Sequence, residues 1–226
     1  MSLPHDDVPI AYLDATMAAA SPPPSKPRDD RVNGAIFVAV LVVIMWCVEV
    51  IDTISGGDLE RHGIEPHDPD ALPAIAAAPF LHAGWGHLIG NTIPFVILGC
   101  MIALSGLRRV IWVTVIVAVV AGLGVWIFAP AGTVHIGASG LVFGYASYLI
   151  FRGLFSRSVV HIGVGLVVVV LYGTTLLFGL APRDGISWQG HLFGAIGGVL
   201  AAWWLDRRED KASGPADRTP VKVSAV

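Results

Sequence analysis

The chain has 226 residues, of which 54% are hydrophobic and 14% are charged, and its formal net charge at pH 7 is −3. Soluble globular domains carry about 25% charged residues, so this composition is too poor in polar surface for an ordinary water-soluble domain. The mean hydropathy of +0.71 supports the same conclusion. We therefore expect an integral membrane protein.

Apolar residues gather in six blocks, each close to the length of a membrane-spanning helix. A bilayer core needs about 20 such residues per helix. Unpaired backbone groups are too costly in hydrocarbon, so each block is expected to be helical. The blocks, in chain order, are 34–54, 86–105, 110–129, 138–155, 159–180 and 187–205. The sequence thus predicts an all-α polytopic membrane protein with a six-transmembrane-helix bundle over residues 34–205.

The two ends of the chain differ from this apolar centre. Residues 1–33 include the proline-rich run 21–27, and residues 206–226 are again polar. Neither stretch has the apolar residues needed to form a core, so both are predicted to be disordered tails.

The basic residues predict the orientation in the membrane. Arginines and lysines accumulate before the first block, after the second, around the turn between the fourth and fifth, and after the sixth. The long connection 55–85 is instead acidic. Basic loops favour the cytoplasmic side. Both tails are therefore expected in the cytoplasm, and the chain is expected to cross the plasma (inner) membrane several times.

The two cysteines are not expected to form a disulfide. Cys47 lies near the outer end of the first block, whereas Cys100 lies well down the second. At the rise of an α-helix their depths differ by roughly 10 Å. That separation is too large for a disulfide.

Four polar residues stand out because they begin apolar blocks that run in the same direction. His87 and Asn91 lie in the first turns of the second block, Ser139 begins the fourth, and His191 begins the sixth. The predicted topology places all of them at one depth near the outer side of the membrane. Polar residues inside a membrane are candidates for a functional site.

Glycines at intervals of four residues predict how two of these helices pack. Gly140 and Gly144 lie on the fourth block, and Gly190, Gly194 and Gly198 lie on the sixth. Small residues at this spacing let membrane helices approach closely. If the two stripes face each other, the Ser139 and His191 side chains come within hydrogen-bonding reach.

A serine and a histidine in contact can perform nucleophilic catalysis. The serine hydroxyl is a weak nucleophile unless a base accepts its proton, which His191 could do for Ser139. No aspartate lies in the neighbouring helix ends to orient the imidazole, so a dyad is expected rather than a triad. His87, Asn91 and the Ser139 backbone N–H could stabilise the oxyanion that forms.

Three motifs, in this order, carry a resemblance to a known family: His82-x4-His87-x3-Asn91, Gly137-Ala138-Ser139-Gly140, and Gly190-His191-x2-Gly194-x3-Gly198. Together they resemble the rhomboid intramembrane serine proteases over about residues 34–205. The resemblance implies that Ser139 is the nucleophile and His191 the general base. It also implies cleavage of substrate transmembrane helices near their outer ends, without metal or cofactor.

The resemblance extends to supporting residues. His87 and Asn91 match the side chains of the oxyanion hole, His82 matches a supporting histidine, and Gly137 matches a glycine that shapes the oxyanion pocket. Gly140 follows the nucleophile directly. The chain departs from the family in two places: Phe143 stands where a tyrosine often packs on the catalytic histidine, and the first loop lacks a Trp-Arg pair found in some members.

The expected partners are transmembrane protein substrates and the lipid bilayer, with no nucleic acid and no metal. The connection 179–187, just ahead of His191, is a candidate for a mobile lid over the site. Three alternative functions remain open. They are a catalytically inactive adaptor that binds transmembrane helices, a small transporter with a polar route through His87, Asn91, His135 and His191, and a metal site formed by His82, His87, His135 and His191.

Overall fold

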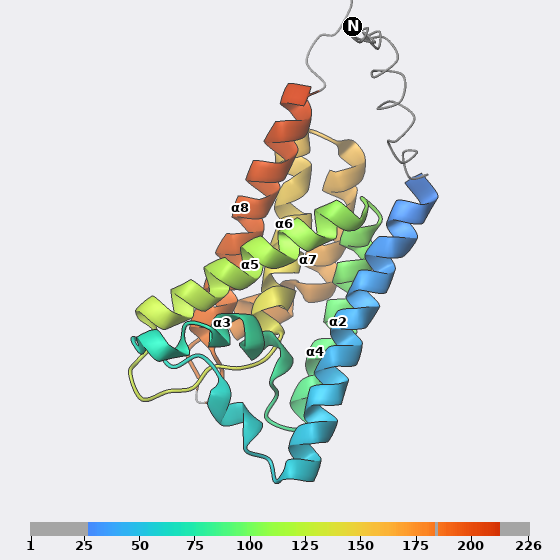
Figure 1. Ribbon diagram of the computed structural model, residues 1–226. Helices are drawn as coiled ribbons and strands as arrows, with labels where there is room; N and C mark the ends of the chain where they lie inside the picture. The colour runs from blue at the N-terminus through green and yellow to red at the C-terminus, as the bar shows by residue number, and fades with distance from the viewer. Residues whose placement is uncertain (1–26, 184, 213–226) are drawn as a thin grey trace, which may run out of the picture.

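The computed structural model describes residues 27–183 and 185–212, and within them every regular element is helical. Six long helices form a bundle (Figure 1). They are α2 (Pro27–Ser55), α4 (Trp85–Ala103), α5 (Leu107–Phe128), α6 (Ser139–Ser156), α7 (Val159–Gly179) and α8 (Trp188–Ala212). The all-α prediction is therefore confirmed for the described residues.

The long connection between α2 and α4 folds into four short helices: η1 (Leu59–His62), η2 (Pro69–Ala71), α3 (Ala74–Ala77) and η3 (Ala78–Phe80). Figure 1 shows them at one end of the bundle, opposite the start of α2 and the end of α8. Ile64 in this connection pairs with His135 through two backbone hydrogen bonds of 3.0 Å, so the connection is attached to the loop that precedes α6.

At both ends the helices extend beyond the predicted tail boundaries. Helix α2 begins at Pro27 rather than 34. Proline suits a first helical turn, and the carboxylates of Asp29 and Asp30 in that turn interact favourably with the positive end of the helix dipole. Helix α8 continues to Ala212 rather than 205, because Asp206 forms a buried ion pair with Arg109 of α5. The predicted tails beyond these points, 1–26 and 213–226, lie outside the described residues.

Helix α6 lies at the centre of the bundle and packs against α4, α5, α7 and α8. Its contact with α8 runs along the two glycine stripes. A Cβ atom added to Gly194 would collide with the Gly140 carbonyl oxygen, and one added to Gly198 would collide with the Gly144 carbonyl oxygen. The two backbones touch directly, which places the first turns of α6 and α8 side by side.

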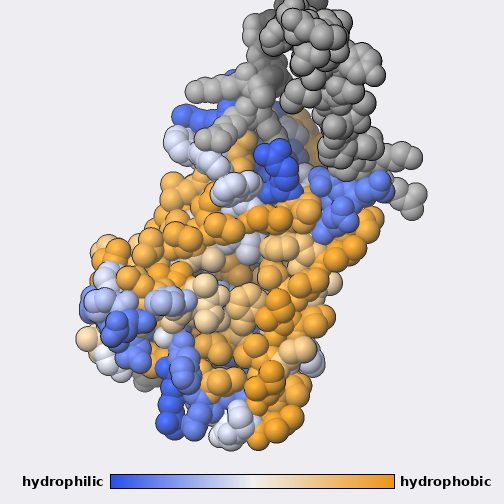
Figure 2. Space-filling model, viewed as in Figure 1, coloured by the Kyte–Doolittle hydropathy of each residue, from blue (hydrophilic) through white to orange (hydrophobic). Residues whose placement is uncertain are grey.

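Four helices in the described part are long and apolar enough to cross a membrane, namely α2, α4, α5 and α7. Helices α6 and α8, which the sequence also predicts as spans, fall below that level of hydropathy. Both pack on several neighbours, and their facing surfaces carry glycine and serine, so they need less apolar surface. Figure 2 shows apolar residues covering α2 and α5 and polar residues gathered toward the two ends.

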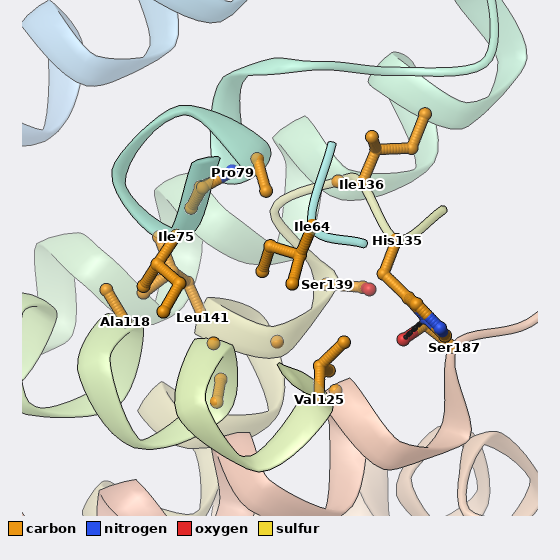
Figure 3. Close-up of a pocket in the computed structure, with 16 residues that line it drawn as sticks. Ile64, Ile75, Pro79, Ala118, Val125, His135, Ile136, Ser139, Leu141 and Ser187 are labelled. Atoms are coloured by element: carbon orange, nitrogen blue, oxygen red, sulfur yellow. Dashed lines mark hydrogen bonds between the residues drawn. The ribbon is translucent and has the colours of Figure 1, made fainter. Parts of the chain in front are cut away.

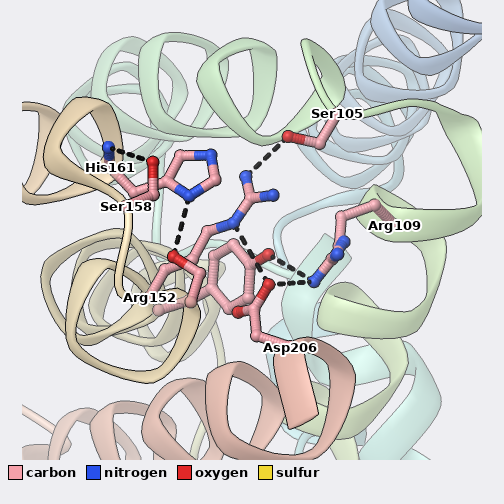
Figure 4. A network of polar contacts seen from close by, with 8 residues as sticks. Ser105, Arg109, Arg152, Ser158, His161 and Asp206 are labelled. Atoms are coloured by element: carbon pink, nitrogen blue, oxygen red, sulfur yellow. Dashed lines mark hydrogen bonds and ion pairs between the residues drawn. The ribbon is translucent and has the colours of Figure 1, made fainter. Parts of the chain in front are cut away.

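A buried charged cluster joins α5, α6 and α8 (Figure 4). Its member Arg152 lies toward the end of α6 opposite Ser139. Arg109 donates to Asp206 at 2.9 Å and to the Tyr148 hydroxyl at 3.2 Å. Arg152 lies 3.5 Å from the same carboxylate and donates to Ser105 at 2.6 Å. The cluster ties the start of α5 to the ends of α6 and α8.

Both cysteines are free, as predicted.

Candidate active site

Ser139 is the first residue of α6, and the local backbone presents its side chain at the helix end. Gly137, two residues earlier, has a φ of 103°, a left-handed conformation that favours glycine. The turn at Gly137 is fixed by a 2.8 Å hydrogen bond from its N–H to the Ala78 carbonyl of η3. The nucleophile candidate therefore sits on a turn that another segment holds in place.

His191 lies in the first turn of α8 and is buried. Its Nε2 atom is 2.8 Å from the Ser139 Oγ atom. Its Nδ1 atom is 2.7 Å from the Gly179 carbonyl oxygen at the end of α7. Because a carbonyl only accepts, Nδ1 carries the proton, and in the neutral ring Nε2 accepts from the Ser139 hydroxyl.

Phe143 completes the setting of this histidine. It lies one turn after Ser139 on α6, and its ring stacks on the His191 imidazole with 4.1 Å between centroids and 5° between planes. The Phe143 ring on one face and the Gly179 carbonyl at one edge thus fix the position of the His191 imidazole. The phenyl ring fills the place expected for a tyrosine but contributes no hydroxyl.

His87 and Asn91 lie one turn apart on α4 and converge on Gly137. A Cβ atom on Gly137 would come within 2.8 Å of His87 Nε2 and 3.5 Å of Asn91 Nδ2. The Ala83 N–H donates to His87 Nδ1, which leaves the proton on Nε2. The buried Asn91 Nδ2 has no hydrogen-bond partner among the described residues. Two donors therefore point to the space beside Ser139.

His82 supports His87 from outside the helix. It precedes α4, is buried, and stacks edge-on against His87 with 5.1 Å between ring centroids. Its Nδ1–H donates to the Phe80 carbonyl at 3.3 Å. Burial, and to a smaller extent the nearby His87, lowers the pKa of His82 to about 4. His82 is therefore neutral at pH 7 and acts as a packing group.

Two cavities meet at Ser139. An open cavity of about 970 Å³ reaches the surface past His87, Asn91, Arg183 and His191. A smaller one, of about 40 Å³, also reaches Ser139 and has mostly apolar walls, including Ile64, Ile75 and Val125 (Figure 3). Water could thus reach the hydroxyl from the wide cavity, whereas the narrow one has room for a small group only.

A second serine–histidine pair, which the sequence interpretation did not identify as a pair, lines both cavities. His135 Nδ1 lies 2.7 Å from Ser187 Oγ, and His135 Nε2 lies 2.9 Å from Thr133 Oγ1. His135 precedes Ser139 by four residues, and Ser187 precedes His191 by four. That equal spacing is visible in the sequence, but the contact requires two loops to meet, which sequence spacing does not reveal.

The histidines weighed as metal ligands do not form such a group. Within residues 27–183 and 185–212, no three histidine, cysteine or carboxylate side chains are arranged to hold a metal ion. His82 and His87 contact each other, whereas His135 bonds to Thr133 and Ser187, and His191 to Ser139 and Gly179.

Comparison with known proteins identifies the family. The family model described as Rhomboid domain matches residues 71–208, well over half of the chain. An uncharacterized protein of Mycobacterium tuberculosis is 44% identical over 193 residues, covering 82% of this chain and 80% of its own. An uncharacterized protein of Mycobacterium leprae is 42% identical, covering 79% and 74%. Rhomboid protease GluP of Bacillus subtilis is 29% identical, covering 74% and 33%. This chain is a multi-pass membrane protein of the rhomboid family.

Proposed function

We propose that this chain is an active intramembrane serine endopeptidase with a Ser139–His191 dyad. The observation that carries the proposal is the 2.8 Å contact between Ser139 Oγ and His191 Nε2, with the His191 proton held on Nδ1 by the Gly179 carbonyl. This arrangement presents an accepting nitrogen to a serine hydroxyl, which is the requirement for general-base activation.

In the first half of the reaction, Ser139 Oγ attacks the carbonyl carbon of the scissile peptide while its proton passes to His191 Nε2. The negative charge on the carbonyl oxygen is stabilised by His87 Nε2–H, Asn91 Nδ2–H and the Ser139 backbone N–H. One such donor contributes about 3 kcal/mol to transition-state stabilisation. His191 then protonates the leaving amine, and the acyl-enzyme forms.

In the second half, water from the wide cavity attacks the acyl carbonyl as His191 Nε2 takes its proton. The same three donors stabilise the second oxyanion. Collapse returns the proton to Ser139 Oγ and releases the new carboxyl terminus. The four groups that act directly are therefore Ser139, His191, His87 and Asn91.

The proposed topology has six spans, with α6 and α8 as interior spans alongside the four apolar ones. The site then opens to the outside of the plasma membrane, and both termini lie in the cytoplasm. The connection 55–85 lies at the same end as Ser139 and contains one arginine and no lysine, and this scarcity of basic residues supports the orientation.

The proposed substrates are transmembrane helices, cut near their outer ends. A membrane helix satisfies its own backbone, so the scissile bond is accessible only after local unwinding. Glycine, proline or polar residues near the cut make that unwinding easier. The 40 Å³ cavity beside Ser139 supports cleavage after a small residue such as alanine.

The test is cleavage of a model transmembrane substrate by purified protein in liposomes. Wild type is compared with Ser139→Ala and His191→Ala, with the thermal unfolding of each variant measured in the same lipid. Cleavage by wild type alone supports the dyad. A folded wild type that binds but cleaves none of several helix-destabilised substrates would instead favour the inactive helix-binding adaptor.

A further inference from the structure

We propose that His135 and Ser187 are positioning residues: their hydrogen bond keeps the nucleophile and the base aligned through the whole catalytic cycle. The inference rests on the proposed function. It starts from the 2.7 Å contact between His135 Nδ1 and Ser187 Oγ, which Figure 3 shows at the edge of the narrow cavity.

The donors and acceptors around His135 define the direction of this bond. The Thr133 hydroxyl donates to the Pro130 carbonyl at 2.6 Å, so its oxygen accepts from His135 Nε2–H. His135 Nδ1 is then the acceptor, and the Ser187 hydroxyl donates to it. Burial lowers the pKa of His135, which keeps the ring neutral at pH 7. A continuous chain of hydrogen bonds thus runs from Ser187 to Pro130.

Each member of the pair is coupled tightly to one member of the dyad. Ser187 directly precedes α8, and the His191 N–H donates to the Ser187 carbonyl at 3.1 Å, so the two residues share one helical turn. His135 leads into the Gly137 turn, and its backbone is held by two 3.0 Å bonds to Ile64. Displacing either residue would displace the catalytic group four positions later.

The reaction itself creates the need for such a link. Once Ser139 is acylated, its oxygen has no proton to donate, so the Ser139–His191 hydrogen bond is lost in the acyl-enzyme. His191 must nevertheless stay in position to deprotonate water. The His135–Ser187 bond joins the same two segments and takes no part in proton transfer, so it persists through every step.

The proposal predicts a specific effect on kinetics. Ser187→Ala and His135→Ala should each lower kcat by about 10- to 100-fold with little change in KM, since small misplacements of catalytic groups have large effects on rate. The double variant should be no slower than either single variant by more than about twofold, because both remove one interaction. Ser187→Thr, which keeps a hydroxyl, should retain most activity.

The chain supplies a matched control. Ser156 and His161 form another serine–histidine hydrogen bond, of 2.9 Å, at the opposite end of the bundle. Ser156→Ala should leave kcat unchanged. Equal losses from Ser156→Ala and Ser187→Ala, or multiplied losses in the His135→Ala/Ser187→Ala double variant, would contradict the positioning role.

A measurement without turnover separates this proposal from the proposed function. In protein labelled with ¹⁵N-histidine, Ser187→Ala should shift the ring-nitrogen resonances of His191 as well as those of His135, whereas Ser156→Ala should shift neither. Unchanged His191 resonances would overturn the positioning role even if wild type cleaves. If the His191 resonances shift while no substrate is cleaved, the link stands and the protease assignment fails.

Discussion

The buried Asn91 amide is informative at the scale of single residues, because it lacks a hydrogen-bond partner among the described residues. A buried donor left without a partner destabilises a folded protein by about 1–3 kcal/mol. At this position a reacting oxygen could accept the bond, so the arrangement suits binding of a transition state. The folded protein is then slightly destabilised before the reaction, and that free energy is regained when the oxyanion of the transition state accepts the Asn91 hydrogen bond.

The role of Asn91 is tested by Asn91→Ala. We expect kcat to fall by about 10²- to 10³-fold, the usual effect of removing one oxyanion donor, while KM changes little. The matched control is Thr92→Ala, because Thr92 is the next residue on α4 and its hydroxyl instead contacts Trp46 and the Leu88 carbonyl. A similar fall in kcat for both variants would argue against a specific role for Asn91.

The lowered pKa of His82 leads to a prediction about how the stability of the protein depends on pH. Its pKa is lowered to about 4 in the folded protein, below the ordinary value of about 6.5 for an exposed histidine. Between these two values the unfolded chain binds the proton and the folded chain does not, so stability falls as the pH drops from about 6.5 toward 4. His82→Gln should reduce this slope. Thermal unfolding in detergent at several pH values measures it, and an unchanged slope would contradict the assignment.

At the scale of helices, the contact between α6 and α8 determines whether the dyad can form. A Cβ atom added at Gly194 would collide with the Gly140 backbone, so a larger residue at Gly194 must push the helices apart. Such a shift would separate Ser139 from His191 as well as weaken packing. Stability and activity are therefore linked at this interface.

Gly194→Ala tests that link. We expect a loss of about 1–3 kcal/mol in stability from overpacking, together with a large loss of kcat. Gly163→Ala is the control, because Gly163 lies in α7 with no atom within 4 Å of an added Cβ. Alanine favours a helix over glycine, so Gly163→Ala should be neutral or slightly stabilising. Wild-type kinetics in Gly194→Ala would show that the close contact is unnecessary.

Much of this arrangement of helices could be predicted from the sequence, for a physical reason. Ser139 and His191 are conspicuous because a polar residue within an apolar block needs a partner, and glycine stripes indicate which helices meet. The His135–Ser187 contact could not be predicted in this way, because both residues lie just ahead of helices, in connections whose paths depend on tertiary packing. Asp206 was assigned to a tail, because a charged residue after an apolar block looks the same whether it is buried or solvated.

At the scale of the whole molecule, the bundle has two polar ends separated by an apolar middle. Ser139 and His191 lie at one end, and the cluster of Arg109, Arg152 and Asp206 lies at the other. The same two helices, α6 and α8, contribute to both. The dyad end has donors and a cavity for chemistry, whereas the charged end joins three helices through ion pairs.

Because the two polar ends are separate, we expect Asp206→Ala to lower the stability of the protein while leaving its kcat nearly unchanged. Removing one partner from a buried ion pair is expected to destabilise a protein by about 3–5 kcal/mol, because it leaves charge buried without compensation. Asp206→Ala should therefore unfold at lower temperature or denaturant concentration. At temperatures where it remains folded, its kcat should stay within about twofold of wild type, since α6 and α8 are still aligned near the dyad by their glycine contacts.

Ser139→Ala should have the opposite effects on stability and cleavage to Asp206→Ala. Ser139→Ala should abolish cleavage with little effect on stability, and the double variant Ser139→Ala/Asp206→Ala should show the stability loss of Asp206→Ala alone, because distant sites contribute independently. A large fall in kcat for folded Asp206→Ala would mean that the charged cluster aligns the catalytic helices. The bundle would then transmit strain along α6 and α8 from one end to the other, and its two ends would have to be treated as one unit.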